Sequence, residues 1–389
     1  MRVCLLFFSF TAACLLASAS AAQQQIEFNG ALRRAAGSAW LIGGAVNVSD
    51  LDTPRVPEFV LSQFNCLTVE TELMPFKLGA QRDAFAFEPA DRVVAWGEQH
   101  HLPIFGHMLL WDYRVPSWLF QDDKGKPLPR EQGLANLRYY IRKVLDHYRG
   151  KMLAWNVVNE AISDAPGEFL RDTAARRCIG EDYIARAFQD AEEADSHVEL
   201  YYNDYNVVVP EKRAKVLRLV QALRAEGRRV DAIGLQGHWT LDFPAAQWID
   251  DTIQAFTNEG VKVRITELDV DVLPRTVNGA NMQTVEHGPD PYTKGLPPDM
   301  QQRLANRYEE IFDHLLAHPA VLSITFWGLH DGRSWLNDFP VLGRTNHALL
   351  FDRQLRPKPA EIAVLRAFAH ARQQREEAMK AHRAEPVAP

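Results

Sequence analysis

Eight short apolar runs alternate with longer helical patterns along this chain, and the alternation predicts an α/β fold, a single-domain (β/α)8 TIM barrel. Two further observations favour one barrel over two smaller domains. No Gly/Ser-rich or Pro-rich linker divides the alternating region, and hydrophobic residues make up 47% of the 389 residues, which is enough for one large core. We expect the barrel to span residues 23–375, between a signal peptide at 1–22 and a flexible tail at 376–389.

The predicted strands are short and rich in β-branched or apolar residues, as buried parallel strands are. They lie near residues 40–46, 64–70, 102–110, 152–158, 198–203, 231–236, 261–268 and 321–327. The clearest helical patterns lie between them, at 134–148, 182–194, 211–226 and 300–317, and a last helix is expected from about 359 to 379. A long loop rich in Gly, Pro and Asn, roughly 272–298, follows the seventh strand at the end where a barrel keeps its active site.

The first 22 residues have the pattern of a signal peptide. Arg2 supplies a positive charge, an almost wholly apolar stretch follows, and small residues then precede a polar segment. Cleavage is expected after about Ala21 or Ala22. A lipoprotein signal with Cys14 as the acylated residue is an alternative, but it would leave a very short signal. The prediction is therefore a secreted or periplasmic protein.

Composition argues against several classes of protein. The formal net charge of −7 disfavours a nucleic-acid partner, and no later apolar stretch approaches the roughly 20 residues of a membrane span. The histidines, His100 and His101 included, show no ligand spacing, so we expect no metal and no other cofactor. After cleavage only Cys66 and Cys178 remain, too few for a disulfide framework or a structural zinc site. Cys66 is most simply a small core residue, and a single disulfide stays an alternative. A monomer is expected.

Two of the predicted strands end in a glutamate. The run Leu153-Ala154-Trp155-Asn156-Val157-Val158-Asn159 leads to Glu160, and the run Val261-Lys262-Val263-Arg264-Ile265-Thr266 leads to Glu267. A carboxylate at the C-terminal tip of a parallel strand lies at the active-site end of a barrel. Two such tips, from strands far apart in sequence, can direct two carboxyl groups at one bond, which is the arrangement used for glycoside hydrolysis.

Other motifs stand at the remaining strand ends. They are Gly106-His107-Met108-Leu109-Leu110-Trp111, Tyr202-Asn203-Asp204-Tyr205-Asn206, Gly234-Leu235-Gln236-Gly237-His238, and Thr325-Phe326-Trp327-Gly328, which is followed by Asp331 and Ser334-Trp335-Leu336-Asn337. With the two glutamate motifs, in this order, the chain resembles glycoside hydrolase family 10, the (β/α)8 retaining endo-β-1,4-xylanases. The resemblance runs from about Trp40 to Ala369. It implies a xylan-type polysaccharide or oligosaccharide as the substrate.

The resemblance also implies roles for individual residues. Glu160 would be the general acid/base and Glu267 the nucleophile of a double displacement. The residues implied to bind sugar are Glu70, His107, Trp111, Asn159, Tyr205, Gln236, His238, Trp327 and Trp335. Individually, a lone histidine or tryptophan here would as readily be a core residue, and Asn203 to Asn206 would as readily be a turn.

Physical arguments add expectations about the two glutamates. His238 is the expected hydrogen-bond donor that keeps Glu267 ionised, and Asp269, two residues along the same strand face, is expected to orient His238. The charge of Glu267 is expected to keep Glu160 protonated. Gln236 needs a partner on a buried strand, and either sugar hydroxyls or Glu267 can supply it.

The sequence departs from the family pattern at four positions. Where family enzymes usually carry Glu-Asn-Glu-Met-Lys, this chain has Thr71 in place of the Asn and Met74 in place of the Lys, with Lys77 close enough in sequence to reach back. Where they carry Trp-His-x-Gln, it has Asp112 and Arg114. Arg114 either pairs with Asp112 or binds an acidic sugar. An endo-β-1,4-xylanase is thus expected, with two alternatives: a retaining β-glycosidase of shifted specificity, or a non-hydrolytic carbohydrate-binding protein.

Overall fold

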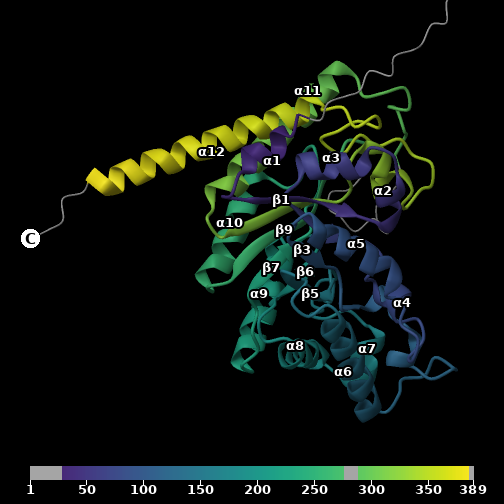
Figure 1. Ribbon diagram of the computed structural model, residues 1–389. Coiled ribbons are helices and arrows are strands. Elements are labelled where there is room, and N and C mark those ends of the chain that lie inside the picture. The colour runs from purple at the N-terminus through teal and green to yellow at the C-terminus, as the bar shows by residue number, and fades with distance from the viewer. Residues whose placement is uncertain (1–28, 276–287, 385–389) are drawn as a thin grey trace, which may run out of the picture.

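The computed structural model describes residues 29–275 and 288–384 (Figure 1). The predicted signal peptide and part of the predicted loop at 272–298 lie outside the described residues. None of the described helices is long and apolar enough to cross a bilayer.

The described strands form one parallel sheet that closes on itself. The strands are β1 (Leu41–Val46), β2 (Cys66–Val69), β3 (Ile104–Gly106), β4 (Leu110–Trp111), β5 (Ala154–Asn159), β6 (Glu199–Asp204), β7 (Ala232–Leu235), β8 (His238–Thr240), β9 (Lys262–Asp271) and β10 (Val321–Phe326). Two of them, β4 and β8, are short additions that pair with β5 and β9. The other eight follow one another around the barrel, and closure comes from β10, which pairs with both β1 and β9. The predicted (β/α)8 barrel is confirmed.

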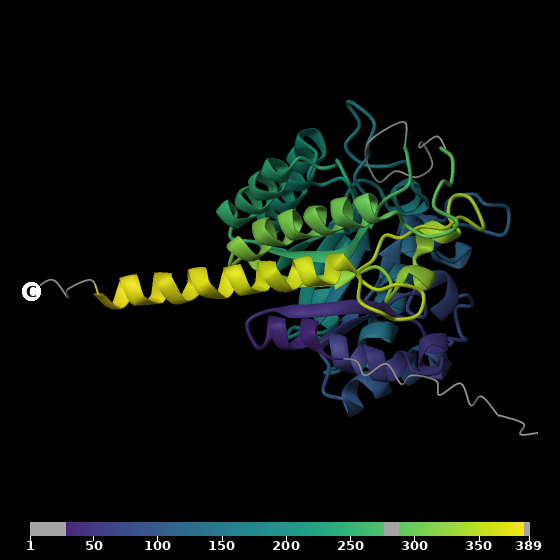
Figure 2. The ribbon, with the colours of Figure 1, turned by 90° about the horizontal axis from the view of Figure 1, so that it is seen from above.

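Helices surround the barrel (Figures 1 and 2). They are α1 (Ala31–Ala36), α2 (Val48–Asp52), α3 (Val56–Gln63), α4 (Pro75–Leu78), α5 (Glu88–Gln99), α6 (Arg130–His147), α7 (Ala174–Ile179), α8 (Tyr183–Ala194), α9 (Pro210–Ala225), α10 (Ala246–Asn258), α11 (Pro298–Ala317) and α12 (Pro359–Ala384). Short 3-10 turns follow some strand ends: η1 (Asp112–Arg114), η2 (Ser117–Leu119), η3 (Asp331–Arg333) and η4 (Trp335–Asn337). Each helix predicted from the sequence is present, with ends that differ by a few residues.

The last helix is longer than its sequence suggested. The sequence predicts a helix that ends near residue 379 and a flexible tail at 376–389. Instead, α12 continues to Ala384. It projects beyond the barrel in both views (Figures 1 and 2). Near the C-terminal part of this helix, Gln373 donates a hydrogen bond to Glu377 one turn later, at 2.9 Å. Such pairs stabilise a helix independently of tertiary packing.

The core requires close backbone approaches that only glycine allows. A Cβ on Gly106, at the end of β3, would lie 2.2 Å from the ring of Trp155 on the adjacent β5. Cys66 is buried in the core, as expected, and Cys178 is also buried; both are free, so the alternative of a disulfide between them is wrong.

Strand register brings the predicted functional residues to one end of the barrel. Trp111 on β4 lies opposite Asn159 on β5, immediately before Glu160. His238 on β8 lies opposite Asp269 on β9, two residues beyond Glu267. The C-terminal ends of these strands therefore place both glutamates and their neighbours at the same rim of the barrel.

Candidate active site

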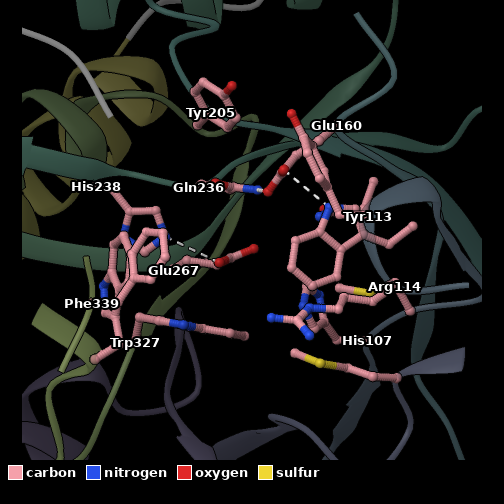
Figure 3. Close-up of a pocket in the computed structure, with 15 residues that line it drawn as sticks. His107, Tyr113, Arg114, Glu160, Tyr205, Gln236, His238, Glu267, Trp327 and Phe339 are labelled. Atoms are coloured by element: carbon pink, nitrogen blue, oxygen red, sulfur yellow. Dashed lines mark hydrogen bonds and ion pairs between the residues drawn. The ribbon is translucent and has the colours of Figure 1, made fainter. Parts of the chain in front are cut away.

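A cleft of about 390 Å³ opens at the C-terminal ends of the strands (Figure 3). It is lined by Met74, His107, Met108, Trp111, Tyr113, Arg114, Asn159, Glu160, Tyr205, Gln236, His238, Glu267, Trp327, Trp335 and Phe339. All the residues that the sequence predicted for catalysis or sugar binding are in this set, except Glu70. We call the part of the cleft lined by Met74, His107, Arg114 and Trp327 the Met74 arm. The part around Tyr113 and Tyr205 is the Tyr205 arm.

Glu160 is the residue immediately after β5, and its backbone lies in the left-handed region with a φ of 57°. This conformation is uncommon for a residue other than glycine, and a hydrogen bond of 2.9 Å from its own N–H to the carbonyl of Asn203 holds it in place. Its two carboxyl oxygens accept hydrogen bonds from Gln236 Nε2 at 2.8 Å and Trp111 Nε1 at 3.0 Å. The partner of Gln236 within the protein is thus Glu160 and not Glu267, which was one of the two alternatives.

Burial raises the pKa of Glu160 to about 7, and the negative charge of Asp204 adds to the shift, whereas the hydrogen bond from Gln236 opposes it. Glu267 also raises this pKa, but less than burial and Asp204 do. The effect expected of Glu267 is therefore present, but it is smaller than those of burial and Asp204, which the sequence did not predict. Because its pKa is near neutrality, Glu160 can both donate and accept a proton at ordinary pH.

Glu267 has the opposite environment. Its Oε1 accepts a hydrogen bond of 2.8 Å from Asn203 Nδ2, and its Oε2 lies 3.1 Å from His238 Nε2. Burial alone would raise the pKa of this carboxyl. The hydrogen bond from His238, the charge that His107 carries at acidic pH, the charge of His238, and the hydrogen bond from Asn203 outweigh burial and hold the pKa below its usual value. Glu267 is therefore ionised where Glu160 is protonated.

His238 connects Glu267 to Asp269, as the sequence predicted. Its Nδ1 lies 3.1 Å from Asp269 Oδ2, and the same oxygen accepts a hydrogen bond of 2.7 Å from Trp335 Nε1. Burial would lower the pKa of His238, but Asp269, and after it Glu267, raise it to about 10. The imidazolium then donates at both nitrogens, which fixes its orientation.

His107 differs from His238 in charge. Burial lowers its pKa to about 4, so it is neutral at ordinary pH. Its ring packs against Trp327 with centroids 5.0 Å apart, and its Nδ1 lies 3.3 Å from Asn156 Nδ2. A neutral imidazole beside a tryptophan ring suits a polar, uncharged ligand such as a sugar.

Aromatic side chains flank the cleft. The Trp335 ring stacks on Phe339 with centroids 5.7 Å apart, and Trp335 also contacts His238. Phe339 and Tyr113 are largely exposed at its edges. Flat apolar faces with few exposed polar atoms are suited to pyranose rings. Phe339 and Tyr113 were not singled out from the sequence, because nothing in their local pattern separates them from ordinary loop residues.

The Tyr205 hydroxyl is already engaged within the protein. It donates a hydrogen bond of 2.6 Å to Asp164 and accepts one from Arg171. Arg171 also donates to the Tyr113 hydroxyl at 2.8 Å, and Lys212 joins Asp164 to the buried Asp204. The ring of Tyr205 lines the cleft, as predicted, while its hydroxyl ties two loops together.

Glu70 lies outside the cleft lining. One of its oxygens accepts a hydrogen bond of 2.8 Å from Asn47 Nδ2 and lies 3.7 Å from Arg333. Thr71 donates to the same Asn47 at 2.8 Å and accepts from Lys77 Nζ at 2.7 Å. Lys77 does reach back toward Thr71, but its ammonium group donates its hydrogen bond to the Thr71 hydroxyl. Met74, and not Lys77, is therefore the side chain of this segment that lines the cleft.

Asp112 and Arg114 point to different neighbours. A carboxylate oxygen of Asp112 accepts a hydrogen bond of 3.1 Å from the backbone N–H of Ala175, at the start of α7. The guanidinium carbon of Arg114 lies 5.4 Å from the ring centroid of Phe76, and Arg114 lines the cleft. The alternative in which Arg114 simply pairs with Asp112 is wrong.

Asn203 is a further residue of the site whose role the sequence did not predict. Its amide nitrogen bridges Asn159 Oδ1 and Glu267 Oε1, at 2.8 Å each, and its amide oxygen accepts from Thr266. The sequence predicts a strand that ends at residue 203, with a turn at residues 203–206 as one interpretation. In the structure β6 continues through Asp204. The available signal was alternation: Tyr201 and Asn203 share one face of the strand, and a polar residue on that face requires a buried partner.

Residues 31–367 match the sequence model of Glycosyl hydrolase family 10. Endo-1,4-beta-xylanase A of Xylanibacter ruminicola is 35% identical over 362 residues, covering 91% of this chain and 96% of that protein. An endo-1,4-beta-xylanase of Geobacillus stearothermophilus is 36% identical over 333 residues, covering 85% and 96%. Among solved structures, a GH10 endoxylanase retrieved from a sugarcane soil metagenome superposes with a TM-score of 0.80 at 36% identity, covering 87% of this chain and 99% of that one.

Proposed function

The chain belongs to glycosyl hydrolase family 10, and from this membership and the site geometry we propose that it is a retaining endo-β-1,4-xylanase. One observation carries the proposal: a carboxyl group with a raised pKa, Glu160, and a carboxylate with a lowered pKa, Glu267, line the same cleft. Retaining and inverting glycosidases both require one protonated and one ionised carboxyl group, and the retaining mechanism follows here from the family.

The proposed reaction has two steps. In the first, Glu267 attacks the anomeric carbon while Glu160 gives its proton to the leaving oxygen, so a glycosyl ester forms on Glu267 and the glycosidic bond breaks. In the second, Glu160, now ionised, takes a proton from water, the water oxygen bonds to the anomeric carbon, and Glu267 leaves as a carboxylate. Ester formation removes the negative charge of Glu267, which lowers the pKa of Glu160 for its role as a base.

The acid fixes the direction of the substrate. The leaving group departs on the side of Glu160, where the Tyr205 arm would receive the aglycone, so the Met74 arm would receive the glycone. Asn159, whose amide oxygen accepts hydrogen bonds from Asn156 and Asn203, is held rigidly to contact the sugar being cleaved. Contacts that strengthen in the transition state raise the rate rather than merely the affinity.

The setting of the enzyme is part of the proposal. We infer that the protein is secreted or periplasmic and acts on extracellular polysaccharide, because residues 1–22 have the pattern of a cleaved signal peptide. N-terminal sequencing of the protein from the culture medium tests this; a mature chain that begins near Gln23 is expected. A chain that stays in the cytoplasm with Met1 intact would overturn it.

A reducing-sugar assay across xylan, glucuronoxylan, mixed-linkage glucan, cellulose and mannan tests the substrate. Xylan or glucuronoxylan should be hydrolysed fastest. The second candidate, a retaining β-glycosidase of shifted specificity, is favoured by Met74, an apolar side chain in the Met74 arm where family enzymes usually have a lysine. Faster hydrolysis of another polymer would support it. Binding without any hydrolysis would support a non-catalytic carbohydrate-binding protein.

A further inference from the structure

Arg114 places a permanently charged group in the Met74 arm. It belongs to the 3-10 turn after β4, and its guanidinium carbon lies 5.4 Å from the ring centroid of Phe76. In Figure 3 the Arg114 side chain extends from the cleft wall toward the open space of the cleft. A guanidinium that lies over an aromatic ring can still direct N–H donors away from the ring toward a ligand.

The nearby carboxylates are engaged elsewhere. Asp112, two residues away in sequence, accepts from the N–H of Ala175, and Glu70 is bonded to Asn47 and lies close to Arg333. Glu267 is matched by His238. Within residues 29–275 and 288–384, Arg114 forms no ion pair. The cleft therefore contains one cation whose counter-charge the protein does not supply.

We propose that Arg114 binds a carboxylate carried by the glycan, as on a glucuronic-acid unit, on the glycone side of the cleaved bond. The inference rests on the proposed function and narrows its substrate to acidic xylan. A guanidinium can hold a carboxylate through two parallel hydrogen bonds, which no neutral amide can do. Arg114 is exposed, and its contact with Phe76 restricts the side chain before the ligand arrives, which reduces the rotamer entropy lost on binding.

The competing account is that Arg114 donates to neutral sugar hydroxyls. That account predicts no preference between acidic and neutral chains, and little sensitivity to ionic strength. The carboxylate account predicts a preference for acidic chains that weakens as salt screens the charges. The two accounts therefore differ in a measurable ratio.

The test compares xylohexaose with xylohexaose that carries one glucuronic-acid unit, either as a branch or at the non-reducing end. The kcat/KM of each is measured at low and high salt for the wild type, Arg114→Gln and Arg114→Lys. Arg92→Gln is the matched control, because Arg92 is an exposed arginine on α5 whose ion-pair partner is Asp52. Products are mapped by mass spectrometry to show on which fragment the acid remains.

In the wild type, acidic hexamers should be preferred by about tenfold or more at low salt, the range expected for a charge-assisted pair. The acid should remain on the fragment with the new reducing end. The preference should vanish in Arg114→Gln, be reduced in Arg114→Lys, which keeps the charge without the fork, and persist in Arg92→Gln. A higher kcat/KM for either acidic hexamer than for xylohexaose supports the proposal. The hexamer that is preferred shows whether Arg114 binds a branching or a terminal glucuronic-acid unit.

Equal kcat/KM for acidic and neutral hexamers in the wild type would overturn the inference and leave the xylanase function standing. An acidic preference that survives in Arg114→Gln would also overturn it. Failure of the wild type to cleave any of the hexamers would remove the proposed function and this inference together. Thermal melting of each variant shows that a changed ratio does not reflect unfolding.

Discussion

The Nε2 atom of His238 lies 3.1 Å from the Oε2 atom of Glu267, and both side chains are buried at the C-terminal end of the barrel. The contact joins an imidazolium, whose pKa is raised to about 10, to a carboxylate, whose pKa is lowered. No ion pair to Glu160 is present among the described residues, and burial, followed by the charge of Asp204, raises its pKa to about 7. Contact with His238 is therefore one of the main differences between the environments of the two glutamates.

Replacing His238 should move the acidic limb of the pH–activity profile. Loss of the hydrogen bond and charge raises the pKa of Glu267, so a larger fraction of the nucleophile is protonated at a given low pH. In His238→Gln the acidic limb of kcat/KM should shift to higher pH, and the maximal rate should fall roughly 10- to 100-fold. His314→Gln, on α11 and paired with Asp250, is the control. An acidic limb that stays in place would show that His238 does not set the charge of Glu267.

Removing the donor to Glu160 should move the opposite limb. The wild-type kcat/KM should fall as pH rises through about 7, where the acid loses its proton. Gln236 stabilises the ionised form of Glu160, so Gln236→Leu should raise that pKa further and shift the basic limb to higher pH. The acidic limb should stay where it is. A shift of the basic limb to lower pH would contradict the proton assignment.

The sequence predicted the parts of the site that depend on strand register. A glutamate at a strand tip, and two acidic residues two positions apart on β9, must face the same way, so Glu267 and Asp269 were expected together. Their common partner, His238, was predicted because its motif stands at the end of the neighbouring strand of the barrel. The barrel was also predictable, because short apolar runs and helical patterns alternate along the sequence.

Contacts between loops were not predictable from the sequence. Nothing local indicates that Asp112 accepts a hydrogen bond from the start of α7, far along the chain, or that Arg114 lies over the ring of Phe76. The strong effect of Asp204 on the pKa of Glu160 likewise depends on how deeply both are buried. Burial and electrostatic coupling of this kind arise only when distant segments are packed together.

Alanine variants of the two glutamates should fail in different ways. Both should lose nearly all activity on polymer. Glu160→Ala should still form the glycosyl ester from aryl-glycosides with good leaving groups, and azide should then restore turnover to give a β-glycosyl azide, whereas Glu267→Ala should not form the ester. Steady-state kinetics with and without azide, with NMR of the product, measure this. Formation of the β-azide by Glu267→Ala instead would require the two roles to be exchanged.

Hydrolysis should retain the anomeric configuration, because a double displacement inverts the anomeric carbon twice. Proton NMR of a reaction with a high enzyme concentration should show the β-anomer first, with the α-anomer appearing later by mutarotation. Initial appearance of the α-anomer would refute the glycosyl ester on Glu267 and indicate direct attack by water.

Met74 should limit the binding of unsubstituted xylo-oligosaccharides. Its thioether lines the cleft but cannot donate a hydrogen bond, and the nearest lysine, Lys77, is bonded to Thr71 instead. In Met74→Lys an ammonium can reach a sugar hydroxyl, and a charge-assisted hydrogen bond is worth about 1.5–3 kcal/mol. We therefore expect kcat/KM on neutral oligomers to rise about tenfold, mainly through KM. Met379→Lys, an exposed methionine on α12, is the matched control and should leave the kinetics unchanged. If Met74→Lys loses activity while the control does not, the Met74 arm fits a sugar that has no hydroxyl at this position, and the substrate class must be revised toward the shifted specificity.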